Sequence, residues 1–367
     1  MESYSYFFNK EYAMEKKIMF FTPSLNIGGI ERVFITYANS LCHSYKVFYI
    51  CCNNIGELST QLDERVEYKS LGNLRLRQSF LLFVNVIKEC TPDFLVSGGE
   101  IPNSICFLAV KIARTNTKII ISQHNYFNVE NNNFINKFII KFIYNKVDAI
   151  ISVSDGITKF LEKLGVNKHL ISTIYNPINL EFIYKQKNMK LDVSIQDYCL
   201  FVGRFSKVKN LYFLIDSFEN VVKKLPKLKL LLVGDGEEKS KILDYIRIKK
   251  LSNSIIYYGC TDNPYPLIKE SRMVLLSSYS EALPTIILES FALGKTVVST
   301  PTLGAIDLIK QGKYGYLTSS MTDINEFANK IITAYNSPIK SNILKEESSF
   351  YDIEKKRIEL EKLILSL

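Results

Sequence analysis

Two glutamates, Glu281 and Glu289, are the residues of this chain best placed to do chemistry. Glu281 stands in a polar loop after the apolar run 274–276, which is typical of a buried strand, and Glu289 stands eight residues later in an expected helix. Open α/β sheets bind ligands beyond the carboxyl ends of their strands, and carboxylates there can accept hydrogen bonds from sugar hydroxyls. The alternative is a pair of solvated carboxylates on an amphipathic helix.

The expected helix also offers a place for an anion. It should run from about Pro284 to Leu293, because proline suits a first helical position and Gly294 suits the left-handed residue after a helix. The N–H groups of a first turn lack partners inside the helix and can hold a phosphate. We therefore expect a ligand with phosphates and sugars at this edge, with the two carboxylates beside its anion site. Leu283, Pro284 and Thr285 belong to the expected donor-binding residues.

Basic residues that could bind phosphates follow an earlier apolar run, 198–202. Arg204 and Lys209 stand in the loop before the next expected helix. A guanidinium and an ammonium can pair with two phosphates at once, although such loop residues are also common without a ligand. A further turn, at Gly234, follows the apolar run 229–233.

The N-terminal half carries a glycine turn and a histidine at expected strand ends. Gly28 and Gly29 lie between a strand-like run at 16–23 and an amphipathic helix, where glycine lets the backbone approach a phosphate. The pattern G-x-G-x-x-G is absent there, which counts against a nicotinamide-dependent enzyme. His124 follows the apolar run 118–122, where either a ligand contact or a structural role is open.

Other polar residues of this half have weaker placement. Ser97 and Asn103 are expected at the rim of the sheet, where they could touch an acceptor or be ordinary loop residues. We expect His43 and His169 to be structural.

Composition limits the class of protein. A chain of 367 residues with 47% hydrophobic residues can form two domains, and it contains no apolar run long enough to cross a membrane and no signal-peptide pattern. The seven cysteines lack metal-like spacing, so we expect buried thiols in a reducing cytosol. The net charge of +9 comes without a nucleic-acid-binding motif and favours an anionic membrane surface over nucleic acid.

The segment 134–147 combines apolar residues at helical spacing with lysines. Such a basic amphipathic helix can lie in the headgroup region of a membrane, here through Lys137, Lys141 and Lys146. The alternative is a helix that packs on the core and exposes its basic face to water.

Strand-like and helix-like segments alternate along both halves, which is typical of doubly wound parallel sheets. We expect five parts: a tail at 1–15, a first domain at 16–178, a linker at 179–196, a second domain at 197–350 and a terminal helix at 351–367. The terminal helix is expected to cross back to the first domain.

The pattern of Glu281, seven residues and Glu289, with Leu283, Pro284 and Gly294, resembles the donor site of glycosyltransferase family 4. Three further motifs are similar to family motifs: the Gly-Gly-Ile-Glu-Arg string at 28–32, Val-Gly-Arg at 202–204 followed by Lys209, and the turn at 234–236. All of these motifs occur along the chain in the order found in the family. The spacing favours Lys209 over Lys207. Here 303–307 departs from the family pattern, with one glycine and Asp307, so the role of Asp307 is open.

The resemblance implies a retaining transferase with the GT-B fold, in which two Rossmann-like domains face each other across a cleft. It implies that Glu289 holds the ribose, Glu281 contacts the transferred sugar, Arg204 and Lys209 bind the diphosphate, and His124 lies near the sugar. No D-x-D motif occurs near these residues, so we expect no metal and no cofactor besides the donor.

We therefore expect transfer of a hexose or N-acetylhexosamine from a nucleotide sugar, UDP-linked by family frequency, to a glycan or lipid-linked acceptor in surface polysaccharide synthesis. The expected location is the cytoplasm, with 134–147 on the inner face of the cell membrane. Two alternatives stand beside this one, a nucleotide-sugar epimerase of related architecture and a non-catalytic nucleotide-sugar-binding protein.

Overall fold

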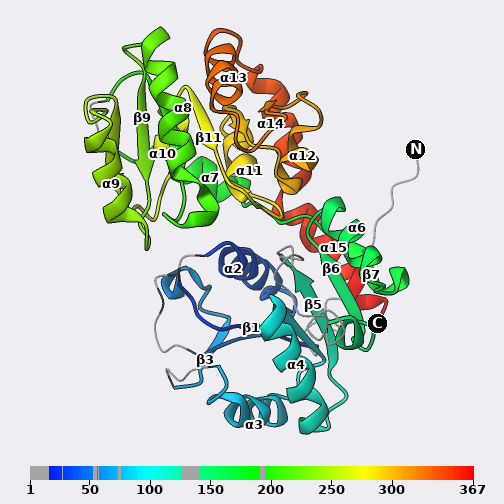
Figure 1. Cartoon of the computed structure of the whole chain (residues 1–367). Coiled ribbons are helices and arrows are strands. Elements are labelled where there is room, and N and C mark those ends of the chain that lie inside the picture. The colour runs from blue at the N-terminus through cyan, green and yellow to red at the C-terminus, as the bar shows by residue number, and fades with distance from the viewer. Residues whose placement is uncertain are drawn as a thin grey trace. The chain divides into compact units, whose positions relative to one another are not determined.

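The computed structural model describes residues 16–26, 28–52, 56, 58–72, 76–124, 140–190 and 195–367. The chain forms two compact units (Figure 1), unit 1 from residues 1–177 with 353–367 and unit 2 from residues 178–352. Each unit is an α/β domain built on a parallel sheet, which confirms the expected Rossmann-like fold class.

Unit 1 is built on a seven-stranded parallel sheet with the order β3-β2-β1-β4-β5-β6-β7. Five of these strands are buried except for at most one end residue, as expected for a parallel sheet covered on both faces. The strands are β1 (Lys17–Thr22), β2 (Lys46–Cys51), β3 (Glu67–Ser70), β4 (Phe94–Gly98), β5 (Lys118–Gln123), β6 (Ala149–Ser152) and β7 (Ile171–Thr173).

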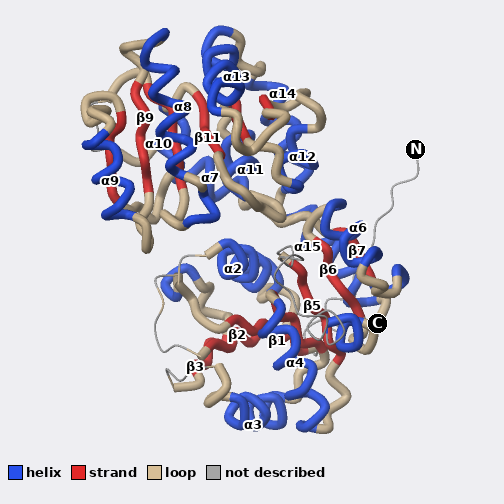
Figure 2. The backbone as a smooth tube through the Cα atoms, viewed as in Figure 1, coloured by secondary structure: helices blue, strands red, loops and turns tan. Residues whose placement is uncertain are grey.

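Helices cover both faces of the unit 1 sheet (Figure 2). The terminal helix α15 packs against α2, and their buried side chains share one core with β1 and β2. Helices α3 and α4 pack together on the opposite face. The helices described here are α2 (Gly29–Leu41), α3 (Phe80–Cys90), α4 (Glu100–Ala113), α6 (Asp155–Lys163) and α15 (Ile353–Leu365), with 3-10 turns at Ser59–Gln61 and Lys168–Leu170.

Unit 2 is built on a six-stranded parallel sheet with the order β10-β9-β8-β11-β12-β13. Its core on one face is aromatic and includes Phe201, Phe205, Phe218 and Phe327. The strands are β8 (Tyr198–Val202), β9 (Lys229–Val233), β10 (Ile255–Gly259), β11 (Met273–Leu276), β12 (Thr296–Ser299) and β13 (Tyr316–Leu317).

Two groups of helices flank the unit 2 sheet. Helices α8, α9 and α13 supply the aromatic core face, whereas α11 packs against α14, α12, α10 and α7. Their bounds are α7 (Leu180–Gln186), α8 (Leu211–Lys224), α9 (Lys239–Ile248), α10 (Tyr265–Glu270), α11 (Thr285–Ala292), α12 (Leu303–Ile309), α13 (Ile324–Asn336) and α14 (Ser341–Ser348), with 3-10 turns at Lys207–Lys209 and Ser349–Tyr351.

The order of strands reverses at one place in each sheet. In unit 1, β1 lies between β2 and β4, and in unit 2, β8 lies between β9 and β11. Connections leave such a place in opposite directions, which opens a crevice at the carboxyl ends of the two strands. The loops after β8 and β11, which carry Arg204, Lys209 and Glu281, meet at this place in unit 2.

The segment expected to be a linker, 179–196, is partly helical instead. Asn179 caps α7 through its side chain, which accepts a hydrogen bond from the N–H of Phe182, and α7 packs against α10 and α11 of unit 2. The chain passes between the units at 177–178 and again at 352–353. These two passages are neighbours, because the N–H of Ile178 donates to the carbonyl of Tyr351.

Within the described part of the chain, no helix is long and apolar enough to cross a membrane. The basic amphipathic helix expected at 134–147 lies mostly outside the described residues. Its described end is helical at 140–144, with Ile140, Ile143 and Tyr144 buried and Lys141 exposed.

Candidate active site

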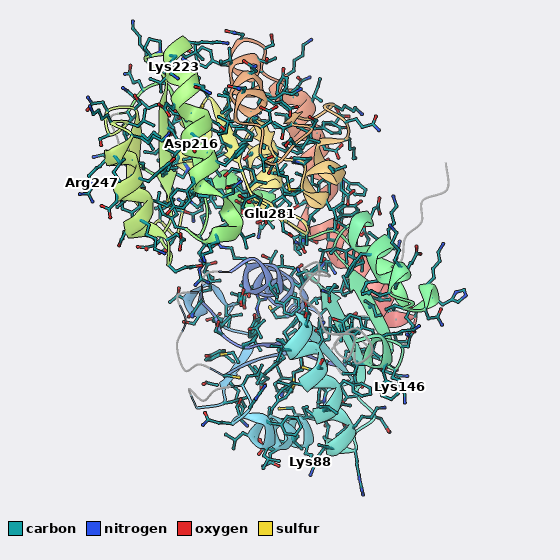
Figure 3. The ribbon with its side chains drawn as sticks, viewed as in Figure 1. Lys88, Lys146, Asp216, Lys223, Arg247 and Glu281 are labelled. Atoms are coloured by element: carbon teal, nitrogen blue, oxygen red, sulfur yellow. The ribbon has the colours of Figure 1, made fainter. Side chains whose placement is uncertain are left out.

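In unit 2, Glu281 and Lys209 form an ion pair at the carboxyl ends of β11 and β8. The Lys209 ammonium donates to Glu281 Oε1 at 2.5 Å, and the Ser278 hydroxyl donates to the same oxygen at 2.6 Å. The Lys209 and Glu281 side chains are only 24% and 15% exposed. A partly buried pair of this kind is positioned before any ligand arrives, and Figure 3 labels Glu281 at this edge of unit 2.

Hydrogen bonds to backbone carbonyls hold the loop of Glu281 against its neighbours. The Ser277 hydroxyl donates to the carbonyl of Lys209, and the N–H of Tyr279 donates to the carbonyl of Val208, so the loops after β8 and β11 are tied together. From the other side, the Thr300 hydroxyl donates to the carbonyl of Ser278 at 2.6 Å. These contacts fix the position of Glu281 relative to Lys209.

The first turn of α12 supports the same loop. The N–H of Gly304 donates to the carbonyl of Glu281 at 3.0 Å, and a Cβ at residue 304 would overlap the backbone of Ala282. The glycine at 304 therefore has a packing reason. Sequence reasoning missed Ser278 and Thr300, whose role depends on contacts between loops that follow different strands.

Glu289 is buried inside α11, with 8% of its surface exposed. The alternative of a solvated carboxylate on an amphipathic helix is therefore wrong for this residue. The helix is shorter than expected, Thr285–Ala292, because Pro284 adopts an extended conformation and caps the helix instead of opening it. Gly294 has a φ of +68°, so the expected left-handed residue after the helix is confirmed.

Arg204 lies at the same end of the sheet but is held loosely. Its side chain is 74% exposed and forms an ion pair with Glu237 at 3.3 Å. Gly234 follows β9 with a φ of +135°, and a Cβ there would overlap the carbonyl oxygen of Gly203. The glycine at 234 thus allows the loops after β8 and β9 to touch, a structural reason that needs no ligand.

In unit 1, the glycine turn opens α2 after β1. Gly28 caps the helix without a side chain, and a Cβ at 28 would overlap the carboxylate of Glu31. No described atom lies within 4 Å of the place where a Cβ of residue 29 would stand, so the fold itself does not require glycine at 29. Burial raises the pKa of Glu31, a residue whose placement over the turn the sequence did not indicate.

His124 is buried at the end of β5. Its Nε2 lies 2.8 Å from the Ser122 hydroxyl, and its ring meets Phe34 of α2 edge-on with centroids 5.9 Å apart. Desolvation lowers the pKa of His124 to about 3, so the imidazole is neutral near pH 7. A neutral, buried histidine can donate or accept one hydrogen bond, but it does not supply positive charge.

The expected rim positions of Ser97 and Asn103 are wrong. The Ser97 hydroxyl donates to Asn103 Oδ1 at 2.8 Å, and Asn103 Nδ2 donates to the Tyr144 hydroxyl at 3.1 Å. Ser97 and Asn103 are fully buried, because β4 extends to Gly98 and α4 begins at Glu100. They hold α4 to the sheet and to the helical turn at 140–144.

Two family models match the chain and together span most of it. The model described as Glycosyltransferase Family 4 matches residues 27–182, and the model described as Glycosyl transferases group 1 matches residues 183–349. The chain is a glycosyltransferase. The resemblance and the expected enzyme class are thereby confirmed.

One relative of this glycosyltransferase is a Campylobacter jejuni enzyme named as an alpha-1,4-N-acetyl-D-galactosaminyltransferase acting on an undecaprenol-diphosphate-linked glycan. It is 27% identical over 330 residues, covering 84% of this chain and 86% of its own. Anabaena HepE, solved with UDP and glucose, has a TM-score of 0.82 at 21% identity over 96% of this chain and all of its own. Sucrose-phosphate synthase from Thermosynechococcus elongatus has a TM-score of 0.80 at 16% identity over 96% and 99%. These likenesses confirm the fold.

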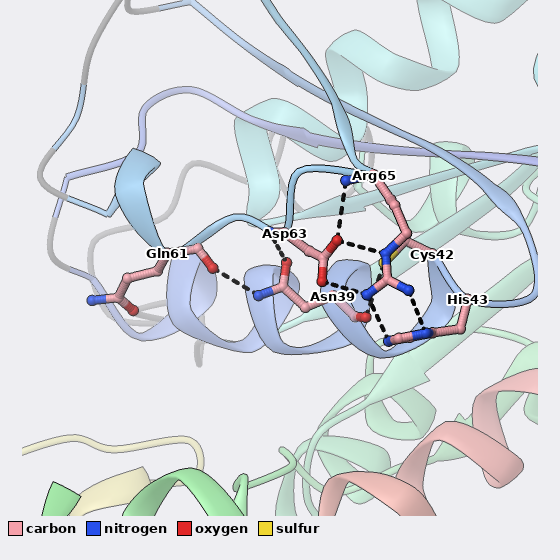
Figure 4. A network of polar contacts seen from close by, with 6 residues as sticks. All are labelled: Asn39, Cys42, His43, Gln61, Asp63 and Arg65. Carbon is pink, nitrogen blue, oxygen red and sulfur yellow. Dashed lines mark hydrogen bonds and ion pairs between the residues drawn. The ribbon is translucent and has the colours of Figure 1, made fainter.

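Among the described residues of the glycosyltransferase, one trio could hold a metal ion: Cys42, His43 and Asp63. The Arg65 guanidinium already lies among them (Figure 4), bound to Asp63 at 2.7 Å and 2.8 Å and 2.7 Å from His43 Nδ1. Cys42 follows the C-terminal end of α2, whereas the glycine turn lies at the N-terminal end of the same helix. At about 1.5 Å per residue, the helix separates them by roughly 20 Å. This network joins α2 to the loop at 61–65 and lies away from the glycine turn.

Replacing His124 by glutamine is expected to make unit 1 less sensitive to acid. Between pH 6.5 and about 3, His124 is protonated in the unfolded chain but neutral in the folded chain. Proton binding therefore favours the unfolded state, and the free energy of unfolding falls as the pH falls. From pH 7 to pH 4.5 the glycosyltransferase should lose on the order of 2 kcal/mol more than His124→Gln in denaturant unfolding. The control is His169→Gln, at an exposed histidine, and an equal acid response of wild type and His124→Gln would contradict the prediction.

Proposed function

We propose that this glycosyltransferase transfers a hexose or an N-acetylhexosamine from a UDP-sugar to a glycan or lipid-linked acceptor in bacterial surface polysaccharide synthesis. The observation that carries the proposal is the preset cluster of Lys209, Glu281 and Ser278 beside the start of α11. Lys209 and the first N–H groups of α11 suit a diphosphate, and Glu281 and the buried Glu289 suit sugar hydroxyls. The named relatives, one acting on a lipid-linked glycan and one solved with UDP, support this substrate class.

The proposed chemistry retains the configuration at the sugar. The acceptor oxygen bonds to the anomeric carbon on the face from which the diphosphate oxygen leaves, and the acceptor proton passes to that leaving group. Lys209, Arg204 and the start of α11 stabilise the charge that develops on the diphosphate. Glu281 positions the sugar, and Glu289 holds the ribose of the donor. The proposed donor-binding residues also include Leu283, Pro284 and Thr285 at the start of α11. They further include Gly28 and Gly29 before α2, and Gly234 after β9.

We place the enzyme in the cytoplasm with a peripheral contact to the anionic inner face of the membrane through 134–147. Its substrates and not a separate cofactor supply the reacting groups. His124, neutral and buried, is proposed to lie near the transferred sugar and not to carry charge.

Turnover of radiolabelled nucleotide sugars with lipid-linked acceptors tests the proposal. We expect transfer with one class of UDP-sugar, and a thermal-shift screen should first identify the donor because a selective ligand stabilises the folded state. Epimerisation of the donor without an acceptor would replace the proposal by the epimerase alternative. Selective binding without any turnover would leave a non-catalytic binding protein.

Transfer is expected to survive EDTA. We expect protein cations, Lys209 above all, to neutralise the diphosphate in place of a divalent ion. Initial rates with and without EDTA check this, after removal of adventitious metal. A complete loss of activity that Mg²⁺ or Mn²⁺ restores would contradict the prediction.

A further inference from the structure

Helix α4 of unit 1 is apolar on its solvent side as well as on its buried side. Its buried face packs Cys106, Phe107 and Val110 against the sheet. On the opposite side Ile101, Ile105, Leu108 and Ile112 follow one another at intervals of four, three and four residues, which places them in one stripe. Ile101, Leu108 and Ile112 are 66%, 48% and 50% exposed.

Helix α3 enlarges this apolar surface. It packs beside α4 on the same face of the sheet (Figure 2) and exposes Leu81 and Leu82 at 69% and 44%. We call the surface of Leu81, Leu82, Ile101, Leu108 and Ile112 the α3–α4 face. Single exposed apolar residues are ordinary, but a group of five on two adjacent helices indicates a partner.

The charges around the α3–α4 face are almost all positive. Lys88, Lys111 and Arg114 are exposed near the C-terminal ends of the two helices, and none of them forms an ion pair with any other described residue. Of the two acidic residues in these helices, Glu89 is paired with Lys69 at 2.7 Å and Glu100 is half-buried.

Further cations lie on the helical turn that packs next to α4. Tyr144 of this turn bonds to Asn103 of α4, and Lys141 and Lys146 are exposed beside Phe142. The Lys146 ammonium lies over the Phe142 ring, 4.0 Å from its centroid, and Figure 3 labels Lys88 and Lys146 on the outside of unit 1.

We propose that the α3–α4 face binds the surface of an anionic lipid bilayer, with its apolar side chains at the level of the acyl boundary and its lysines and arginine among the headgroups. A bilayer satisfies both features at once, because it offers apolar depth and a negative surface. A second copy of this chain fits less well. A symmetric contact would bring the same unpaired cations together, and like charges across an interface oppose association.

The inference does not rest on the proposed transferase activity, and it concerns a surface that the sequence did not indicate. It shares Lys141 and Lys146 with the contact expected at 134–147, but its apolar residues belong to α3 and α4 and are all described. Sequence patterns missed it because α4 is apolar on two sides, which by sequence alone indicates a fully buried helix.

Flotation of the full chain with vesicles tests the proposal. At low ionic strength we expect the wild type to float with vesicles of phosphatidylcholine that contain phosphatidylglycerol, and to float at least fivefold less with phosphatidylcholine alone. Raising the salt concentration should release it, because exposed charges are screened. The double variants Leu108→Gln/Ile112→Gln and Lys111→Gln/Arg114→Gln should each reduce flotation at least fivefold.

The matched control is Ile248→Gln, at an apolar residue of α9 in unit 2 that is 76% exposed. It should float like the wild type. Absence of wild-type flotation with anionic vesicles, or double variants that float like the wild type and the control, would overturn the proposal. A wild-type dimer in sedimentation that Leu108→Gln/Ile112→Gln dissociates would instead assign the face to a second copy. Donor binding by all variants, measured in parallel, keeps this outcome separate from the fate of the proposed function.

Discussion

Replacing Lys209 by alanine is expected to weaken the binding of a nucleoside diphosphate by about 10- to 150-fold, the largest single effect that the structure predicts on donor binding. A hydrogen bond between charged groups contributes about 1.5–3 kcal/mol, and about 1.4 kcal/mol corresponds to a factor of ten. Lys209 also neutralises Glu281 at 2.5 Å, so its removal leaves a partly buried carboxylate beside the place of the diphosphate. Loss of an attractive charge and gain of a repulsive one act in the same direction.

Calorimetry with UDP and with uridine measures this effect, since uridine carries no phosphate and should lose little. The structure supplies two internal controls on the same loop. Lys207→Ala removes an exposed lysine of the same 3-10 turn and should leave the affinity for UDP unchanged. Arg204→Ala should have a smaller effect than Lys209→Ala, because Arg204 is 74% exposed and paired with Glu237. Equal losses for UDP and uridine, or a larger effect of Lys207→Ala, would contradict the assignment of Lys209.

Much of the fold follows from local patterns in the sequence. Short apolar runs bounded by glycine and polar residues predict the strands, and their alternation with helix-like segments predicts two parallel sheets. This works because a strand buried on both faces leaves little choice of residue type. The helix of Glu289 is predicted to within one residue at each end, and the difference arises because Pro284 caps the helix in an extended conformation.

The contacts of the candidate site are harder to predict. Lys209 and Glu281 are 72 residues apart, and they meet because β8 and β11 are neighbours in the sheet, which no local pattern states. The same holds for Thr300, which reaches the loop of Glu281 from the end of β12. Burial is equally difficult, since the polarity of Ser97 and Asn103 suggested an exposed rim although they bond to each other inside unit 1.

The ion pair between Lys209 and Glu281 also affects what we expect when Glu281 and Glu289 are each replaced by glutamine. Glu289→Gln is expected to weaken UDP and UDP-sugar alike, by roughly 1–3 kcal/mol, because glutamine keeps the size but loses the charge and one acceptor oxygen for the ribose. Glu281→Gln is expected to leave UDP binding intact or to tighten it. It removes a negative charge near the diphosphate and frees Lys209 from its present partner.

The loss in Glu281→Gln should appear in turnover. If Glu281 contacts the transferred sugar, its interaction strengthens as the bond to the diphosphate breaks, and an interaction made in the transition state raises kcat. Two identical chemical changes therefore predict opposite profiles, a loss of UDP affinity at 289 and a loss of kcat at 281. UDP calorimetry and initial rates measure both, after circular dichroism shows that each variant is folded, which matters most for the buried Glu289. A loss of UDP affinity confined to Glu281→Gln would exchange the two roles, and the same profile in both variants would remove them. The reason is that Glu281 is paired with Lys209 in unit 2, so it can strengthen UDP binding only through Lys209.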